Sequence, residues 1–290
     1  MRISLFYNKN AGDGVPLDHI RDVIEQHGHE LVQVVEKATG LDRLLEPRPD
    51  LVVAAGGDGT IARAVRTLAH RRIPLAILPL GTANNIAKSV GTAASIDDII
   101  GGLETARRVP LDLGVADGVW GRRHFVEAVG GGLIPAAIAE MKTRSDGDQL
   151  PTSAKMAGAV RAISAVLSRL QPGEWTIVAD GARTSGEFLL VEILNIRAIG
   201  PNLVLSADTD PSDGLFRLVV AGENDREAIA RYLQDLLEGR DHPVSLTSQC
   251  ARHVTLEGTT DIHVDGEVPS GLPPRTVSVH VDAGAVEVLV

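Results

Sequence analysis

Three segments that each follow a short apolar run combine glycine with hydroxyl or amide side chains and could bind an anion. They are YNKNAGDG at 7–14, GGDGT at 56–60 and LPLGTANN at 78–85. Glycine allows close backbone approach to a ligand, and backbone N–H groups at a helix start attract anions. One such turn is weak evidence, because tight turns use glycine for steric reasons alone. Three turns at one edge of a sheet predict a phosphate-bearing ligand, most simply a nucleotide.

Neither common nucleotide fingerprint occurs. No Gly-x-Gly-x-x-Gly follows the first apolar run, and no Gly-x-x-x-x-Gly-Lys-Ser/Thr is present. Both absences argue against a dinucleotide-dependent dehydrogenase and against a P-loop enzyme.

Acidic side chains lie mostly in the second half of the chain. Candidates are Asp213 in DPSDGLF, Asp265 and Glu267 in HVDGEVPSG, and Asp112 in LDLG. Carboxylates are ligands that Mg²⁺ prefers, and an alcohol that attacks a phosphoryl group needs a carboxylate to take its proton. Taken singly, an Asp-Gly pair is most often only a turn. For each Asp-Gly pair considered by itself, a turn without a catalytic role is therefore the favoured interpretation.

The elements that must position the three segments alternate between strands and helices. Strands are expected at 3–7, 30–36, 51–55 and 75–78, and helices at 16–28, 41–45, 60–70, 83–90 and 96–103. This alternation predicts an open parallel sheet covered by helices.

The second half has a different pattern, in which strands dominate. They are expected at 109–115, 124–129, 175–179, 187–195, 215–220, 251–256, 262–264 and 277–281, with helices at 133–141, 153–170 and 226–238. The pattern predicts an antiparallel, β-rich, sandwich-like second domain. We expect an α/β domain at 1–114 and a β-rich domain at 115–274, with 275–290 returning to the first.

Charge and cysteine content exclude several classes of protein. The 290 residues carry a net charge of −10, which argues against a nucleic-acid partner. The single cysteine, Cys250, excludes an internal disulfide framework, and no apolar run approaches the roughly 20 residues of a membrane span. A cytoplasmic protein is expected. Small basic clusters, such as Arg122/Arg123/His124, could meet a polyphosphate or an anionic membrane, although a solvated surface is favoured.

Together these motifs resemble the diacylglycerol kinase catalytic family, which also contains sphingosine kinases and soluble bacterial lipid kinases. GGDGT at 56–60 is similar to its nucleotide-binding loop, LPLGTANNIAKSVG at 78–91 to its second phosphate-side motif, and DGE at 265–267 to its catalytic segment. LDLG at 111–114 and SDGLF at 212–216 match weaker motifs. The order and spacing hold from about residue 5 to 270.

The resemblance implies an ATP-dependent kinase in which the active site lies in the cleft between the two domains. Asp265 would be the general base for a lipid hydroxyl, with Glu267 assisting. Mg²⁺ would be bound by Asp213 with backbone oxygens near Asp210 and Leu215. ATP would contact the residues Asn8, Gly56, Gly57, Asp58, Gly59, Thr60, Thr82 and Asn84.

One departure from the family pattern concerns the metal. The second motif usually reads Asn-Asp, whereas Asn84 is followed here by Asn85, which removes one carboxylate from the network expected around Mg²⁺.

Three functions stay open at this stage. The first is a lipid kinase, acting on diacylglycerol, phosphatidylglycerol or a sphingoid base, that associates transiently with a membrane surface. The second is a phosphotransferase on a soluble acceptor, because NAD kinases also carry Gly-Gly-Asp-Gly. The third is a lipid- or nucleotide-binding homologue without turnover. The sequence also leaves open whether the protein forms a homodimer.

Overall fold

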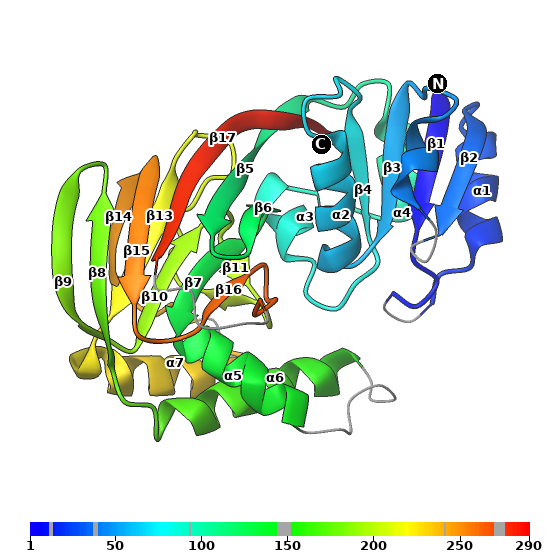
Figure 1. The fold of residues 1–290 in the computed structure, drawn as a ribbon. Helices are drawn as coiled ribbons and strands as arrows, with labels where there is room; N and C mark the ends of the chain where they lie inside the picture. The colour runs from blue at the N-terminus through cyan, green and yellow to red at the C-terminus, as the bar shows by residue number, and fades with distance from the viewer. Residues whose placement is uncertain (12–13, 37–39, 93, 144–151, 241, 270–275) are drawn as a thin grey trace. The chain divides into compact units, whose positions relative to one another are not determined.

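The chain forms two compact units, shown in Figure 1. The computed structural model describes residues 1–11, 14–36, 40–92, 94–143, 152–240, 242–269 and 276–290. The first unit comprises Met1–Asp112 and Ala283–Val290, and the second comprises Leu113–Asp282. Strands β5 (Arg108–Gly118) and β17 (Thr276–Leu289) contribute residues to both units.

The first unit is built on a parallel sheet in the order β2-β1-β3-β4, extended by the end of β17, which pairs with β4 through Val288 and Leu75. Its strands are β1 (Arg2–Tyr7), β2 (Glu30–Glu36), β3 (Leu51–Gly56) and β4 (Leu75–Pro79). Its helices are α1 (Leu17–Gln26), the 3₁₀ helix η1 (Leu41–Leu45), α2 (Asp58–Leu68), α3 (Asn85–Val90) and α4 (Ile96–Gly102).

Successive side chains of a strand point to opposite faces of the sheet. Because successive residues of β1 and β3 are buried, both faces of the sheet are covered by helices. Leu5 of β1 belongs to the buried core that contains Ile20 of α1 and Ile100 of α4. The next side chain, Phe6, lies under the guanidinium of Arg63 on α2, at 5.7 Å from the ring centre. The segments that follow β1, β3 and β4 lie at the carboxyl ends of these strands.

The second unit is a sandwich. One layer is the antiparallel sheet β14-β13-β10-β7-β16. The other contains β5 with β6 and the antiparallel series β17-β15-β8-β9. Both layers bury side chains in one core. In this core the rings of Phe125 and Phe216 stack, with 5.6 Å between their centres. The strands are β6 (Gly121–Phe125), β7 (Ala128–Gly132), β8 (Gly173–Ala179), β9 (Ala182–Phe188), β10 (Leu190–Leu194), β13 (Phe216–Ala221), β14 (Thr247–Ala251), β15 (His253–Gly258) and β16 (Ile262–Val264).

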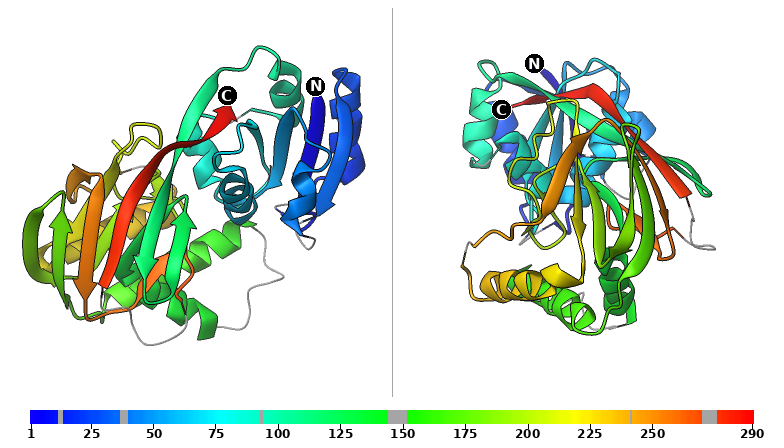
Figure 2. Two further views of the ribbon diagram at one scale, coloured as in Figure 1. Left: turned by 45° about the horizontal axis from the view of Figure 1, so that its top comes forward. Right: turned by 90° about the vertical axis from the view of Figure 1, so that its left-hand side faces the viewer.

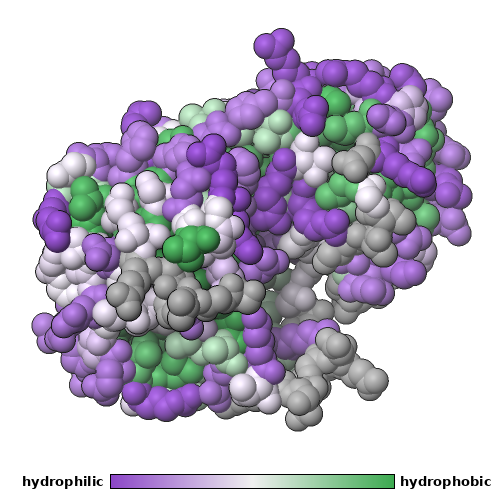
Figure 3. All heavy atoms as spheres, in the orientation of Figure 1, coloured by the Kyte–Doolittle hydropathy of each residue, from purple (hydrophilic) through white to green (hydrophobic). Residues whose placement is uncertain are grey.

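A helical layer covers the outer face of the sheet that contains β10. It consists of α5 (Leu133–Thr143), α6 (Thr152–Leu167) and α7 (Arg226–Leu237), which Figures 1 and 2 show side by side. Its core includes Leu190 and Leu194 of β10. In Figure 3 hydrophilic residues predominate on the visible face, and an apolar patch lies over this layer. The 3₁₀ helix η2 (Glu223–Asp225) and the short strands β11 (Ala198–Ile199) and β12 (Leu203–Val204) complete the unit. Among the described residues, no helix is long and apolar enough to cross a membrane.

The predicted architecture, a parallel α/β unit followed by an antiparallel β-rich unit, is confirmed. Several element boundaries differ from the prediction. The strands expected at 124–129, 187–195 and 251–256 are each divided in two, and most of β9, residues 182–186, lies outside the expected strands. Helix α2 begins at Asp58, two residues earlier than expected, so the glycine loop runs directly into the helix.

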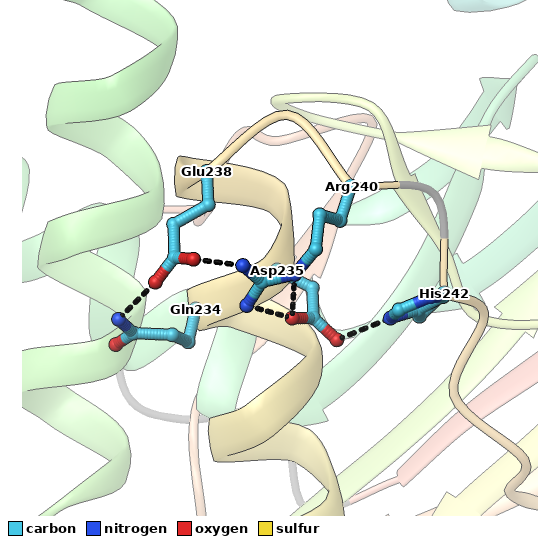
Figure 4. A network of polar contacts seen from close by, with 5 residues as sticks. All are labelled: Gln234, Asp235, Glu238, Arg240 and His242. Carbon is cyan, nitrogen blue, oxygen red and sulfur yellow. Dashed lines mark hydrogen bonds and ion pairs between the residues drawn. The ribbon is translucent and has the colours of Figure 1, made fainter.

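A polar network fixes the end of α7 (Figure 4). Arg240 donates from Nε to Asp235 Oδ1 at 2.7 Å, and His242 Nδ1 lies 3.1 Å from Asp235 Oδ2. Gln234 donates to Glu238, which also pairs with Arg240. The pKa of Asp235 is lowered chiefly by the hydrogen bond from Arg240 and less by that from His242.

We expect Arg240→Gln to raise the pKa of Asp235 toward its ordinary value of 3.8. The pKa is lower in the folded chain than in the unfolded one, so the ionised carboxylate stabilises the fold above the unfolded pKa. That contribution is lost as pH falls through the folded pKa. Carboxyl-carbon NMR titration measures the shift, and Arg183→Gln on the exposed strand β9 is the control. An unchanged Asp235 titration in Arg240→Gln would disprove the assignment.

Candidate active site

A pocket of about 270 Å³ lies in the first unit at the carboxyl ends of three strands. The loops after β1, β3 and β4 form it, which are the three segments singled out in the sequence. Its lining is Asn8, Asn10, Ala11, Gly57, Asp58, Gly59, Thr60, Gly81, Thr82 and Ala83. Within the described part of the chain no lysine or arginine lines it, so the donors it can offer to an anion are backbone N–H groups and the amide and hydroxyl side chains of the loops.

Two glycines bring the second and third loops into contact. A Cβ on Gly57 would lie 3.1 Å from the Cα of Gly81, and a Cβ on Gly81 would lie 2.3 Å from the Cα of Gly57. Any side chain at Gly81 would therefore push the two loops apart. Gly56 has a different role, because its missing Cβ leaves room for the Thr60 side chain, which would otherwise lie 2.6 Å away.

The start of α2 presents N–H groups to the pocket. Its N-cap is Gly57, and no side chain caps the helix. The N–H of Thr60 donates to the carbonyl of Gly57 at 2.8 Å, whereas the N–H groups of Asp58 and Gly59 have no acceptor within the helix. Asn8 Nδ2 donates to Thr60 Oγ1 at 3.3 Å, which ties the first loop to this helix. Asp58 Oδ1 accepts the N–H of Ile86 at 3.0 Å and fixes the start of α3.

Asn84 stabilises its own loop. Its Oδ1 accepts the N–H of Gly81 at 2.8 Å, and its Nδ2 donates to the carbonyls of Pro79 and Gly81. The residue has a φ of 53°, in the left-handed region that Asn tolerates. Asn84 lies outside the pocket lining, and the following Asn85 is buried. Asn84 thus shapes the loop that brings Gly81 and Thr82 to the pocket.

The predicted catalytic carboxylate lies in a tight turn of the second unit. Asp265 and Gly266 have φ values of 47° and 73°, and Val264 and Glu267 exchange two backbone hydrogen bonds of 2.8 and 2.9 Å. This is the geometry of a two-residue hairpin turn for which Asp-Gly is favoured. The Asp265 carboxylate accepts N–H bonds from Val126, Glu127 and Ala128 at 2.8 to 3.3 Å. Those bonds interrupt the strand expected at 124–129 and fix the orientation of the carboxylate.

Glu267, at the end of the same turn, is 80% exposed, and its Oε2 lies 3.4 Å from Arg123 Nη1. An exposed pair of this kind contributes little to stability. Its side chain can therefore change partners without disturbing the turn.

A second Asp-Gly turn in this unit also binds backbone N–H groups through its carboxylate. Asp180, with φ 46°, precedes Gly181 in the β8–β9 turn and accepts the N–H groups of Arg252 and His253 at 2.9 to 3.2 Å. These backbone bonds lower the pKa of Asp180. They also divide the strand expected at 251–256. The turn at Asp265 is therefore a structural feature whether or not it has a catalytic role.

The predicted metal ligands lie in one loop before β13. Asp210 Oδ1 accepts from the N–H and hydroxyl of Ser212, and Asp213 Oδ1 accepts the N–H of Leu215 at 2.8 Å. The loop thus offers oriented carboxylate oxygens together with backbone carbonyls. Across the described residues, no group of three or more His, Cys, Asp or Glu side chains is arranged to hold a metal.

The structure places the predicted nucleotide-binding residues in the first unit and Asp210, Asp213, Asp265 and Glu267 in the second. The remaining carboxylate candidate, Asp112, belongs to the first unit, where it is buried and its Oδ1 accepts the N–H of Gly284 at 2.7 Å. Sequence reasoning missed Gly81, although it belongs to a quoted motif, and it missed the buried Glu192 and His263. A glutamate within the apolar run LLVEIL was the available signal for Glu192.

Two family descriptions match consecutive parts of the chain. Residues 2–116 match the diacylglycerol kinase catalytic domain, and residues 127–290 match the YegS C-terminal NAD kinase beta sandwich-like domain. The matches together span both structural units.

Individual relatives agree with these matches. A diacylglycerol kinase of Bacillus subtilis is 26% identical over 96% of this chain and 94% of its own. A crystal structure of a diacylglycerol kinase from Bacillus anthracis has a TM-score of 0.73 at 20% identity, covering 99% of this chain and 96% of that chain. An NAD kinase from Archaeoglobus fulgidus, solved with ATP, has a TM-score of 0.56 at 11% identity, covering 100% and 94%. The two solved structures establish a likeness of fold.

Proposed function

The chain belongs to the diacylglycerol kinase catalytic family, and we propose that it transfers the γ-phosphoryl group of ATP to a lipid hydroxyl. The acceptor class proposed is diacylglycerol, phosphatidylglycerol or a sphingoid base, presented at a membrane surface. The reaction is a phosphotransfer to an alcohol, and it depends on Mg²⁺.

The pocket of the first unit is the observation that carries this proposal. Its glycine-rich loops and the uncapped start of α2 bring N–H groups to one place, which suits a chain of phosphates. In this proposal Gly57, Asp58, Gly59 and Thr60 line the phosphates, with Thr82 beside them. Asn8, Gly56 and Asn84 support those loops.

Asp265 is the proposed general base. A carboxylate whose orientation is fixed by backbone N–H groups can accept the proton of an alcohol without first reorganising. Glu267 is proposed to assist it, since its exposed side chain can turn toward an acceptor.

The loop from Asp210 to Leu215 fits Mg²⁺ in its donor chemistry. Mg²⁺ prefers hard oxygen ligands and keeps several waters, and this loop supplies the Asp213 carboxylate and backbone carbonyls near Asp210 and Leu215. Bound Mg²⁺ supplies positive charge that favours phosphoryl transfer. We therefore propose the Asp213 carboxylate and these backbone carbonyls as the Mg²⁺ ligands.

A soluble acceptor is the second candidate, and the fold likeness to an NAD kinase favours it. A protein that binds without turnover is the third, because Asn85 replaces a carboxylate expected near the metal. These candidates predict different fates for the γ-phosphate.

The test incubates the purified chain with γ-labelled ATP, Mg²⁺ and separate acceptors. The acceptors are diacylglycerol, phosphatidylglycerol and sphingosine in mixed micelles, and NAD in solution. Label in a lipid product supports the proposal, and label only in NADP would replace it with the second candidate. ATP binding without transfer to any acceptor would favour the third.

A further inference from the structure

A buried histidine and glutamate lie in the second unit, close to the Asp265 turn. His263 is 2% exposed and Glu192 is fully buried. His263 Nε2 lies 3.0 Å from both carboxylate oxygens of Glu192. Removing two such groups from water is costly unless they bond each other. Nothing in the proposed reaction so far uses this pair.

Gly130 on the strand between them makes the contact possible. His263 of β16 is paired with Gly130 of β7, and Gly130 is paired with Glu192 of β10, so the three residues form one row across the sheet. A Cβ on Gly130 would lie 2.4 Å from Glu192 Oε2 and 2.3 Å from the carbonyl oxygen of Val191. Only glycine at this position lets the two side chains meet across the middle strand.

The hydrogen bonds define which nitrogen of His263 carries the proton. Nδ1 accepts the N–H of Gly266 at 3.2 Å, so Nδ1 is unprotonated. The neutral ring then carries its hydrogen on Nε2 and donates it to Glu192. Glu192 therefore selects the tautomer that presents an acceptor to Gly266.

Gly266 is the second central residue of the turn that contains Asp265. The two hairpin bonds join Val264 and Glu267 and do not use the N–H groups of the two central residues, Asp265 and Gly266. Asp265 donates its N–H to the carbonyl of Ala128 at 2.9 Å, and Gly266 donates to His263. Each central residue of the turn is therefore bound to the sheet by its own N–H.

We propose that His263, held in one tautomer by Glu192, is a positioning residue for phosphoryl transfer. It binds the Gly266 N–H and thereby fixes the turn that aims the Asp265 carboxylate. This inference rests on the proposed role of Asp265 as the base. A displacement of about 1 Å at a reacting group can lower the rate by about 100-fold, so the precision of this turn matters.

Two substitutions separate positioning from a structural role. In His263→Asn the Oδ1 atom replaces Nδ1 and can still accept from Gly266, but the donor to Glu192 is lost. In His263→Gln the Nε2 atom can still donate to Glu192, but the acceptor for Gly266 is lost. The buried Glu192 carboxylate loses its imidazole donor only in His263→Asn, which therefore has the lower Tm.

The inference predicts opposite orders for activity and stability. We expect His263→Asn to have the higher kcat, and His263→Gln the higher Tm with kcat lowered by about 10- to 100-fold. The KM for ATP stays at the wild-type value in both. If kcat follows Tm, so that His263→Gln is at least as active as His263→Asn, His263 is structural and the inference is wrong.

Nitrogen-15 NMR of the wild-type chain tests the same contact without a variant. An unprotonated Nδ1 on His263 together with a Gly266 amide protected from solvent exchange supports the inference even if neither variant folds. A protonated Nδ1, or an unprotected Gly266 amide, overturns it. Wild-type protein that phosphorylates no acceptor would refute the proposed function, whereas the NMR result would still decide the His263–Gly266 contact.

Discussion

Replacing Asp265 with asparagine is expected to lower kcat by about 100- to 10,000-fold, the range that a general base contributes. The affinity for ATP should stay at the wild-type value, because the nucleotide pocket is formed by residues of the first unit. Labelled-ATP transfer measures kcat, and equilibrium binding of ATP measures the affinity. Transfer within about tenfold of wild type would remove Asp265 from the role of base.

The substitution also has a structural effect that needs its own control. Asp265 Oδ2 lies 3.0 Å from the N–H of Val126, and an asparagine amide group would place a donor against a donor there or at a neighbouring N–H. Asp180→Asn causes the same conflict against Arg252 and His253, in a turn of the same type. We expect Asp180→Asn to lower Tm to a similar extent while leaving transfer at the wild-type rate. If both variants lose transfer equally, the effect of Asp265→Asn is structural.

The sequence predicts most of the first unit because its elements are defined locally. The run at 51–55 is buried throughout, and the following glycines mark its end. The helix boundaries of this unit differ from the expected ones by at most two residues, as at Asp58. The pocket could be predicted for the same reason, since the loops after parallel strands must share an edge.

The second unit depends on contacts between distant residues, which a single sequence does not reveal. The break between β6 and β7 exists because Asp265, 138 residues later in the chain than Glu127, binds the amides there. Most of strand β9 was missed because its side chains are exposed on both faces, so they show no apolar alternation. Without an apolar pattern, only its pairing with β8 identifies it.

The contact between Glu192 and His263 likewise joins residues far apart in the sequence, so it could not be predicted from the sequence. HVDGE reads as a strand followed by an Asp-Gly turn, and the structure contains both. The partner of His263 lies 71 residues earlier. Its identification requires the register of three strands and the missing side chain of Gly130. Motifs therefore identify the residues proposed for the chemistry, whereas the residues that orient them become visible only in the fold.

Gly57→Val is expected to abolish ATP binding, and with it transfer, while the second unit stays folded. A Cβ at this position already lies 3.1 Å from the Cα of Gly81, and the two γ-methyl groups of valine extend farther into the space where the loops meet. The loops would separate, and the N–H groups at the start of α2 would no longer converge on one ligand. Gly102→Val is the matched control, since a Cβ there meets nothing within 4 Å, and it should bind ATP normally. Calorimetric titration with ATP measures both variants, and wild-type affinity in Gly57→Val would show that the nucleotide does not bind at these loops.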